Sequence, residues 1–188
     1  MRIFYYNLQC EAFQVEKGMN FMLAFEKISW PQFLEDWRQK NDDRTDDPSE
    51  IYGDIRLPER ATAASAGYDF FAPHAFTLHP GEEITILTGI RAIMPENVVL
   101  IIAPRSGQGM RYKLQLMNTI GVIDADYQHA DNEGHIMIAI YNDHPDEHKV
   151  LTVEKGQAFA QGIFLPYLVT DDDSATAARS GGFGSTDK

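Results

Sequence analysis

The pattern of residues 55–170 constrains the fold more than any other feature. Short runs rich in Ile, Val, Thr, Phe and Tyr are separated by Gly, Pro and Asn at intervals of roughly 8–12 residues. The runs that read as strands are EEITILTGIRAIMP, VVLIIAPRSG, LMNTIGVID, GHIMIAIYND, KVLTVEKG and AQGIFLPYLV. Short strands at this spacing favour an all-β barrel or sandwich over alternating β and α units.

The first 40 or so residues have a different texture. The stretch FEKISWPQFLEDWRQK predicts a short helix, with Ser29 as its N-cap, Pro31 in its first turn and aromatic residues at helical spacing. We expect these aromatics to pack the helix onto the main domain, and a partner-binding surface is the alternative. The acid-rich stretch NDDRTDDPSE, residues 41–50, predicts a solvated linker.

Three segments are therefore expected along the chain. Residues 1–54 form an N-terminal extension with a short helix and an acidic linker, and residues 55–170 form the β domain. Residues 171–188 are small, polar and glycine-rich, which predicts a flexible C-terminal tail.

Charge and composition narrow the function. The chain has 16 Lys+Arg against 28 Asp+Glu, a formal net charge of −12, which argues against stable binding to nucleic acid. A small anionic ligand needs only a few well-placed donors. A single cysteine, Cys10, excludes an intramolecular disulfide and fits a reducing compartment. Without a signal-peptide pattern or a run long enough to span a bilayer, we expect a soluble, cytoplasmic protein that does not bind membranes.

Four short stretches carry residues that can do chemistry. AGYDFFA holds Asp69 between aromatics, and APRSGQG sets Arg105 and a serine beside glycines whose N–H groups can approach an anion. NTIGVIDADY ends an apolar run in Asp124 and Tyr127, and RSGGFGST lies in the tail. Together they describe anion donors, a carboxylate, an aromatic that can stack on a base, and a lid.

In this order the stretches resemble the motifs of the trimeric deoxyuridine triphosphatases (dUTPases), from about Ile55 to Thr186. AGYDFFA, APRSG, GVIDADY, KGQAFAQ and RSGGFGST are similar to motifs one to five of that family. The resemblance implies a jelly-roll-like β subunit and a homotrimer whose active sites are each shared by three chains. It also implies hydrolysis of dUTP to dUMP and pyrophosphate, with in-line attack of water on the α-phosphorus and Mg²⁺ held on the triphosphate.

The resemblance also assigns roles within the nucleoside half of the site. Asp124 is the general base, and Tyr127 packs against the deoxyribose so that a 2′-hydroxyl is rejected by shape. Asn118 helps to read uracil, because discrimination from cytosine needs polar groups in fixed orientation. The backbone of one hairpin is expected to supply the remaining contacts, from Gly121, Val122, Ile123 and the region of Met137.

The phosphate half of the site is implied in the same way. Phosphate contacts are expected from Arg105, Ser106, Gly107 and Gln161. Asp69 would anchor Mg²⁺ through water, since this ion keeps several waters and uses substrate phosphates as ligands. In the tail, Phe183 would stack on uracil, and the γ-phosphate would be met by Arg179, Gly184, Ser185 and Thr186.

Three features depart from the family pattern. Ala158 stands where motif four usually has an arginine, and Arg179 is one residue closer to Phe183 than usual. Residues 129–133 form an insertion after motif three, which we interpret as a polar hairpin insertion, with metal ligation by His129, Asp131 and Glu133 as the weaker alternative.

Two other functions stay open. A dCTP deaminase has the same fold, but its chemistry attacks the base, and the PRSG and GVIDADY stretches resemble the dUTPases better. A regulatory role on a dUTPase scaffold is the other, with residues 1–54 binding a protein partner.

Overall fold

The computed structural model describes residues 22–40 and 46–177 and is mostly β-structure, which confirms the all-β prediction. The helical elements are α1 (Trp30–Lys40), α2 (Pro48–Gly53), α3 (Ser106–Tyr112) and the 3-10 helix η1 (Ala125–His129). The strands are β1 (Ala24–Lys27), β2 (Glu59–Arg60), β3 (Tyr68–Phe71), β4 (Phe76–Leu78), β5 (Glu83–Leu87), β6 (Ile90–Ile93), β7 (Val98–Pro104), β8 (Leu114–Leu116), β9 (Gly121–Ile123), β10 (Met137–Asn142), β11 (Leu151–Val153) and β12 (Ala158–Pro166).

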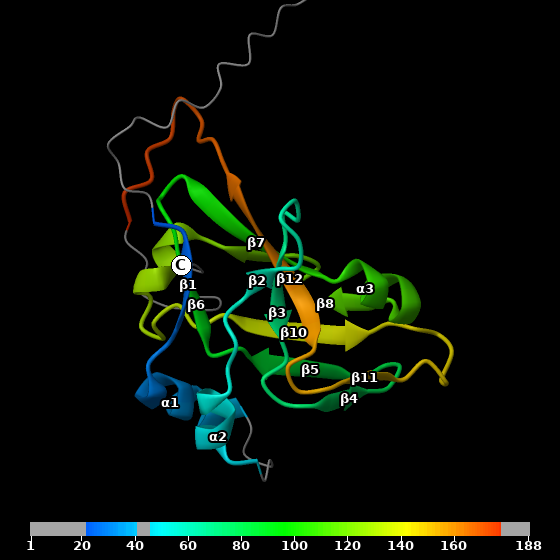
Figure 1. The fold of residues 1–188 in the computed structure, drawn as a ribbon. Coiled ribbons are helices and arrows are strands. Elements are labelled where there is room, and N and C mark those ends of the chain that lie inside the picture. Colours follow the sequence, from blue (N-terminus) through cyan, green and yellow to red (C-terminus); the bar gives the residue numbers. More distant parts are fainter. Residues whose placement is uncertain (1–21, 41–45, 178–188) are drawn as a thin grey trace, which may run out of the picture.

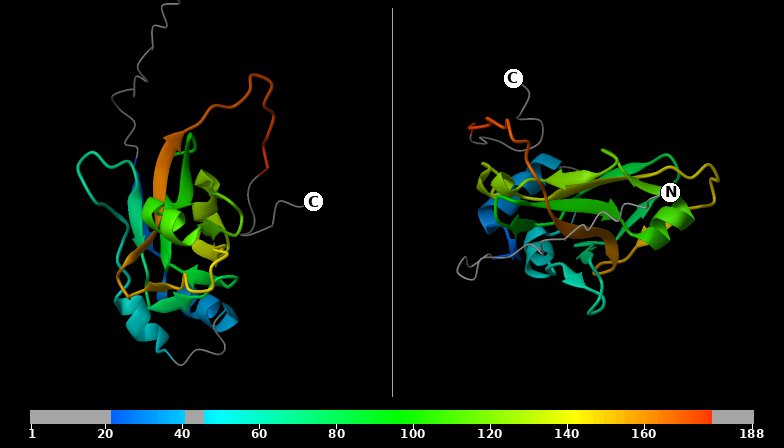
Figure 2. Two further views of the ribbon diagram at one scale, coloured as in Figure 1. Left: turned by 90° about the vertical axis from the view of Figure 1, so that its right-hand side faces the viewer. Right: turned by 90° about the horizontal axis from the view of Figure 1, so that it is seen from above.

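The strands pair antiparallel in four small sheets. The largest has the order β2-β3-β12-β7-β9, the second has the order β5-β10-β8, and β1-β6 and β4-β11 form two-stranded ribbons. In Figures 1 and 2, α1 and α2 lie together at one end of the β-structure, and the chain after β12 leaves from the opposite end. Strand neighbours are far apart in the sequence, so most of the pairing is long-range.

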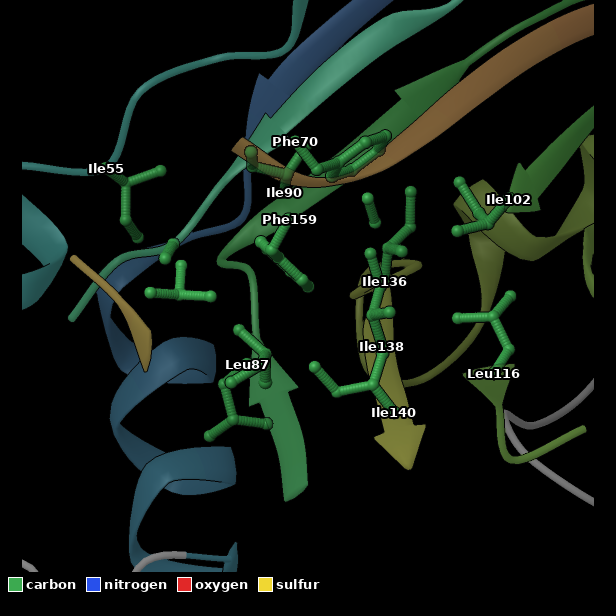
Figure 3. Close-up of a cluster of buried hydrophobic side chains, with 14 of the residues drawn as sticks. Ile55, Phe70, Leu87, Ile90, Ile102, Leu116, Ile136, Ile138, Ile140 and Phe159 are labelled. Atoms are coloured by element: carbon green, nitrogen blue, oxygen red, sulfur yellow. The ribbon is translucent and has the colours of Figure 1, made fainter. Parts of the chain in front are cut away.

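The core fills the space between the sheets. Figure 3 shows side chains from β3, β5, β10 and β12 pointing toward one another. On β10 and the residue before it, Ile136, Ile138 and Ile140 alternate with less buried residues, as a strand with one face on a core requires. Phe70 and Phe159, both fully buried, complete this part of the cluster.

The N-terminal segment is part of the same core. Ile28, Phe33, Trp37 and Ile51 are buried in the hydrophobic cluster that also contains Ile55, so the core is continuous across residue 54. Helix α1 confirms the prediction that its aromatic residues pack onto the β domain. Ring contacts join the helix to that domain, because Phe33 lies 6.2 Å from His135 and Trp37 lies 6.1 Å from His74 between ring centroids.

Helix α1 begins where its capping residue predicts. The Ser29 hydroxyl oxygen accepts a hydrogen bond from the Gln32 N–H at 3.3 Å, which confirms Ser29 as the N-cap. The residues before Ser29 form β1, with Phe25 opposite Ala92 of β6. Phe25 also packs on Phe70 and Phe164, which ties this strand to the core of the β domain.

The predicted solvated linker at residues 41–50 is largely exposed in its described part, residues 46–50, but it becomes helical from Pro48. Helix α2 begins at Pro48, and the Asp47 carboxylate accepts hydrogen bonds from both the N–H and the hydroxyl of Ser49 at 2.8 Å. An N-cap aspartate followed by proline at the first helical position is a helix-start signal, here hidden in an acid-rich stretch. Burial of Ile51 then anchors the helix.

No helix in the described ranges, 22–40 and 46–177, is long and apolar enough to cross a membrane. The predicted flexible tail at residues 171–188 is described only up to residue 177, where the side chains are exposed. Its flexibility and its division from the β domain stay predictions.

Candidate functional site

A pocket of about 750 Å³ gathers the residues predicted to bind phosphate. It lies where β3, β12 and the start of α3 meet. Its lining includes Asp69, Arg105, Ser106, Gly107 and Gln161. These residues come from motifs one, two and four: Arg105 lies 36 residues after Asp69, and Gln161 lies 56 residues after Arg105. We call this pocket the phosphate pocket.

Strand register and one ion pair fix the geometry of the phosphate pocket. Asp69 on β3 lies directly opposite Gln161 on β12, and Arg105 follows the end of β7. The Arg105 Nε atom is 3.1 Å from Oδ1 of Asp69. Gln161 donates from Nε2 to the Pro104 carbonyl at 3.1 Å. Gly67 leaves room for this amide, since a Cβ there would lie 2.6 Å from Gln161 Oε1.

Arg111 is a cation of the phosphate pocket that the sequence analysis missed. It stands in the last turn of α3, which begins directly after Arg105. The Arg105 carbonyl accepts hydrogen bonds from the N–H groups of Gln108 and Gly109, so the glycine-containing stretch after Arg105 is helical. Recognising that helix would have placed Arg111 near Arg105.

A second pocket, of about 560 Å³, gathers the predicted nucleoside residues, and we call it the nucleoside pocket. Its lining includes Asn118, Gly121, Val122, Ile123 and Met137. Ile138 on β10 and Ile136, the residue before this strand, add apolar surface. The lining residues of the two pockets do not overlap.

The expectation that Gly121–Ile123 and Met137 lie on one hairpin is wrong, whereas their contacts with the nucleoside stay a prediction. Strand β9 pairs with β7, where Val122 lies opposite Ile101, whereas β10 pairs with β5 and β8. The segment between them, with η1 and the insertion at 129–133, carries the chain from one sheet to another. Gly121 permits the close approach of β9 to β7, since a Cβ there would lie 2.9 Å from the Ile102 Cβ. The nucleoside pocket is thus walled by two sheets.

Asp124 and Tyr127 follow β9 directly. Asp124 is exposed, comes after the pocket-lining Ile123 and precedes η1 with an extended backbone. Tyr127 is buried, and its hydroxyl donates to the His135 carbonyl at 2.8 Å and accepts from Asn132 Nδ2 at 2.8 Å. Tyr127 is not among the described residues that line either pocket, so its predicted contact with the sugar stays a prediction.

A buried polar pair joins α1 to the segment that leads into β10. His135 is fully buried, and its Nδ1 lies 2.5 Å from Oδ2 of Asp36, also buried. The Gly89 N–H donates to His135 Nε2 at 2.9 Å. Because Nε2 accepts, Nδ1 carries the proton and donates it to the carboxylate. Asp36, together with Gln39 and Lys40, also lines the nucleoside pocket, and sequence analysis missed all three.

The insertion at 129–133 makes a second contact with α1. The Ser29 N–H and hydroxyl donate to the two carboxylate oxygens of Glu133 at 2.7 and 2.6 Å. These side-chain and backbone hydrogen bonds from Ser29 lower the pKa of Glu133 below its usual value of 4.5. Glu133 therefore serves as an external cap for the start of α1.

This cap predicts a pH-dependent part of stability. A carboxylate whose pKa is lowered in the folded state adds stability above its unfolded pKa, here near 4.5, and loses it as pH falls through the lower folded value. Glu133→Gln should cost about 1 kcal/mol at pH 7, equivalent to about 2–4 °C in melting temperature. The gap to wild type should narrow as pH falls below 4.5 and close once pH has passed through the lower pKa of Glu133 in the folded state. Melting curves from pH 7 to 3 measure this.

Glu35→Gln is the matched control for the Glu133 experiment, because Glu35 is an exposed carboxylate on α1 itself. It should leave the melting temperature nearly unchanged at both ends of the pH range. A gap between Glu133→Gln and wild type that stays constant from pH 7 to 3 contradicts the assignment.

Two sequence predictions concern residues elsewhere. The tail residues Arg179, Phe183, Gly184, Ser185 and Thr186 lie outside the described residues, and their roles stay predictions.

Ala158, in place of the motif-four arginine, is buried, and its carbonyl accepts a hydrogen bond from Gln108 Nε2 at 3.3 Å. That position therefore faces the protein and supplies a backbone acceptor.

Comparison with known proteins gives a consistent result. Residues 53–187 match the dUTPase family model. The chain is 42% identical over 135 residues to the deoxyuridine 5′-triphosphate nucleotidohydrolase of Lactococcus lactis subsp. lactis (strain IL1403), covering 70% of this chain and 88% of that protein. It is 36% identical over 146 residues to the enzyme of the same name from Actinobacillus pleuropneumoniae serotype 5b (strain L20), covering 73% and 91%.

Solved structures agree on the fold. The dUTPase of Streptococcus mutans superimposes with a TM-score of 0.57 at 32% identity, covering 79% of this chain and 98% of that one. The dUTPase of Staphylococcus bacteriophage 80alpha gives 0.57 at 22% identity, covering 85% of this chain and 99% of that one. The family match spans well over half of the chain, and the first two relatives exceed 30% identity over more than two thirds of it. The chain therefore belongs to the dUTPase family.

Proposed function

We propose that the protein is a dUTP diphosphatase that hydrolyses dUTP to dUMP and pyrophosphate. The family match supports this activity, as do the names of the relatives that are 36–42% identical. The observation that carries it is the grouping of the predicted residues, with five nucleoside residues in one pocket and four phosphate residues together with the predicted metal anchor Asp69 in the other. The reaction removes dUTP before a polymerase can place uracil in DNA.

Asp124 acts as the general base in this proposal. It is exposed and stands beside the nucleoside pocket, so water and the sugar can reach its carboxylate. A positioned carboxylate orients a water in line with the scissile bond and takes its proton during attack on the α-phosphorus. Asn118 and the backbone of Gly121–Ile123 fix the uracil edge, and Tyr127 limits space at the 2′ position.

Arg105 and Arg111 give the phosphate pocket two cationic side chains. The guanidinium of Arg105 is oriented by Asp69 and keeps further N–H groups that can pair with phosphate oxygens. Ser106 and Gly107 add hydroxyl and backbone donors at the same wall. These groups hold the triphosphate and stabilise the charge on the leaving pyrophosphate.

We propose that the protein works as a homotrimer in which sites are shared between chains. The nucleoside and phosphate pockets have no lining residue in common, so one chain's nucleoside pocket can be completed by another chain's phosphate pocket. Exposed apolar side chains near the nucleoside pocket and after β12 support subunit contacts: Ile120, Val122, Tyr167, Leu168 and Val169. The predicted tail residues would then come from the third chain.

The residues present fit a Mg²⁺ ion that is held mainly by the substrate. No group of three or more His, Cys, Asp or Glu side chains that could hold a metal occurs within residues 22–40 and 46–177. Asp69 lies in the phosphate pocket as a carboxylate, suited to a contact through water. When bound, Mg²⁺ neutralises phosphate charge. The reaction is assigned to the cytoplasm, in keeping with the single cysteine, Cys10.

The decisive experiment measures pyrophosphate release from dUTP, dCTP, dTTP and UTP in the presence of Mg²⁺. We expect strong preference for dUTP, because the pocket must reject both a 4-amino group and a 2′-hydroxyl. Chromatography of the products separates the alternative, since a dCTP deaminase turns dCTP into dUTP without releasing pyrophosphate. Comparable rates with all four nucleotides would exclude the proposed function.

Arg105→Ala should lower kcat/KM for dUTP by about 10–100-fold, because a charge-assisted hydrogen bond to phosphate is lost. Arg105→Lys should recover only part of this, since one ammonium cannot replace the fork of the guanidinium. Steady-state kinetics with melting curves measures the effect. Arg38→Ala, which removes an exposed arginine from α1, is the control. Equal losses in Arg105→Ala and Arg38→Ala would mean that only net charge matters.

A further inference from the structure

Helix α1 lies outside residues 53–187, the part that matches the dUTPase family model. It nevertheless reaches the nucleoside pocket. Its last two residues, Gln39 and Lys40, line this pocket beside Asn118 and Met137, and so does Asp36 one turn earlier. Gln39 and Lys40 are exposed and line this pocket, so a ligand that enters it can reach their side chains. Residues outside the family match therefore form part of the pocket wall.

A line of buried contacts runs from α1 toward Tyr127. Gln32 Nε2 donates to Asp36 Oδ1 at 3.1 Å, and His135 Nδ1 lies 2.5 Å from Asp36 Oδ2. The His135 carbonyl in turn accepts the hydrogen bond of the Tyr127 hydroxyl at 2.8 Å. A shift of Asp36 thus moves His135, and a shift of His135 moves the group that holds Tyr127.

The turn between Tyr127 and His135 is tightly built. Asn132 donates from Nδ2 to the Tyr127 hydroxyl, and its Oδ1 accepts from the Gly134 N–H at 3.2 Å. Gly134 has φ of +74°, and a Cβ there would lie 2.7 Å from the Tyr127 carbonyl oxygen. Such a turn transmits displacement, because it has little room to relax.

We propose that α1 is a specificity element of the nucleoside site. Gln39 and Lys40 form a wall of the pocket, and Asp36 is a positioning residue that fixes Tyr127 through His135. This inference rests on the proposed function, because it takes the nucleoside pocket as the place where deoxyuridine binds. It gives the N-terminal extension a role within its own chain.

The wall is tested with single substitutions on one turn of α1. Lys40→Ala and Gln39→Ala should each raise KM for dUTP by about 3–10-fold while kcat stays within about twofold, because the lost contact stabilises bound substrate in the ground state as well. Arg38→Ala is the matched control for Lys40→Ala, since both remove an exposed cation next to Gln39 and Arg38 does not line the pocket. If KM for dUTP is unchanged in both Lys40→Ala and Gln39→Ala, these two residues do not contact the bound substrate and this part of the proposal is wrong.

The positioning role is tested with Asp36→Asn, which keeps the shape but removes the carboxylate charge. The ratio of kcat/KM for dUTP to that for UTP should fall by about tenfold, since small displacements at a reacting centre have large effects. Trp37→Phe is the control, because Trp37 is a buried neighbour on α1 whose change should lower the melting temperature and leave this ratio alone. A lower melting temperature with an unchanged ratio in Asp36→Asn overturns the positioning role.

Binding measurements separate this inference from the proposed function. Calorimetric titration with dUMP gives a dissociation constant for wild type, Lys40→Ala, Gln39→Ala and Arg38→Ala without any turnover. If wild type hydrolyses dUTP and the pocket variants bind dUMP as tightly as wild type, only the inference about α1 fails. If wild type does not hydrolyse dUTP but dUMP binding weakens in the pocket variants alone, the proposed function fails and α1 remains part of a nucleotide pocket. If Asp36→Asn does not fold, the variants of the exposed residues Gln39 and Lys40 still test whether α1 forms part of the pocket.

Discussion

Asp124→Asn is expected to lower kcat for dUTP by about 10²–10⁴-fold, the range that a positioned general base supplies. Asparagine has nearly the same shape as aspartate but cannot take a proton from water. Because Asp124 is exposed and follows β9 outside the core, the change should leave the melting temperature close to that of wild type. Rapid-quench turnover, titration with a non-hydrolysable dUTP analogue, and melting curves together measure the result.

Asp126→Asn is the matched control for this prediction. Asp126 is also exposed, lies two residues further along and carries the same charge. We expect kcat to change by no more than about twofold, as for most surface substitutions away from a site. If Asp124→Asn loses analogue binding together with its melting transition, Asp124 is structural. If Asp124→Asn and Asp126→Asn lose turnover equally, the negative charge of this segment matters and Asp124 is not the general base.

Phe33→Ala is expected to lower the free energy of unfolding by about 3–5 kcal/mol, the usual cost of removing a fully buried aromatic ring. Phe33 has no exposed surface and packs on Trp30, Trp37 and Tyr52. Its Cδ2 would lie 3.3 Å from a Cβ placed on Gly89, so it also contacts the chain beside β6. Urea denaturation at one fixed protein concentration measures the loss, since subunit association would add to stability.

Met22→Ala provides the comparison for Phe33, because Met22 is a large apolar residue of the same segment that is 58% exposed. Its cost should be within about 0.5 kcal/mol. A chain without residues 1–54 loses Ile28, Phe33, Trp37 and Ile51 from the core together. We expect no cooperative unfolding transition from that truncated chain. A well-folded, fully active truncated protein would contradict both the core role and the pocket role of α1.

Local patterns in the sequence predict much of this fold and site. Apolar runs separated by glycine and proline predict the β strands. The order Ser29, Trp30, Pro31 predicts the start of α1. The motif residues Asp69, Arg105 and Gln161 were predicted from three separate stretches, and they line one pocket. Each of these signals lies within a few residues of chain, which is the range over which capping, turn chemistry and periodicity act.

The features that were missed depend on contacts between distant residues. Nothing near His135 indicates that its ring meets Asp36, which is 99 residues away. Strand β9 was assigned to a hairpin with β10 because they are neighbours in sequence, yet β9 pairs with β7. The acid-rich composition of residues 41–50 hid the N-cap Asp47 and the following Pro48 of α2, a helix that is anchored by the buried Ile51. Pairing and burial are properties of the assembled core, and no local window contains them.

The alternative that residues 1–54 bind a protein partner is narrowed by the same contacts. Phe33 and Trp37, the aromatic residues that suggested such a surface, are buried against the chain's own β domain. A partner could still use exposed parts of this segment, such as the outer face of α1 or the apolar side chains of Met22 and Leu23.

The packing of α1 also sets an order of events during synthesis. Helix α1 leaves the ribosome early, but the histidine that pairs with Asp36 and the glutamate that caps Ser29 are made about 100 residues later. At about 5–20 residues per second, that gap is about 5–20 s. During this interval the indole of Trp37 and the ring of Phe33 lack part of their burial partners. These exposed rings make the nascent chain prone to aggregate until the segment that leads into β10 has been made.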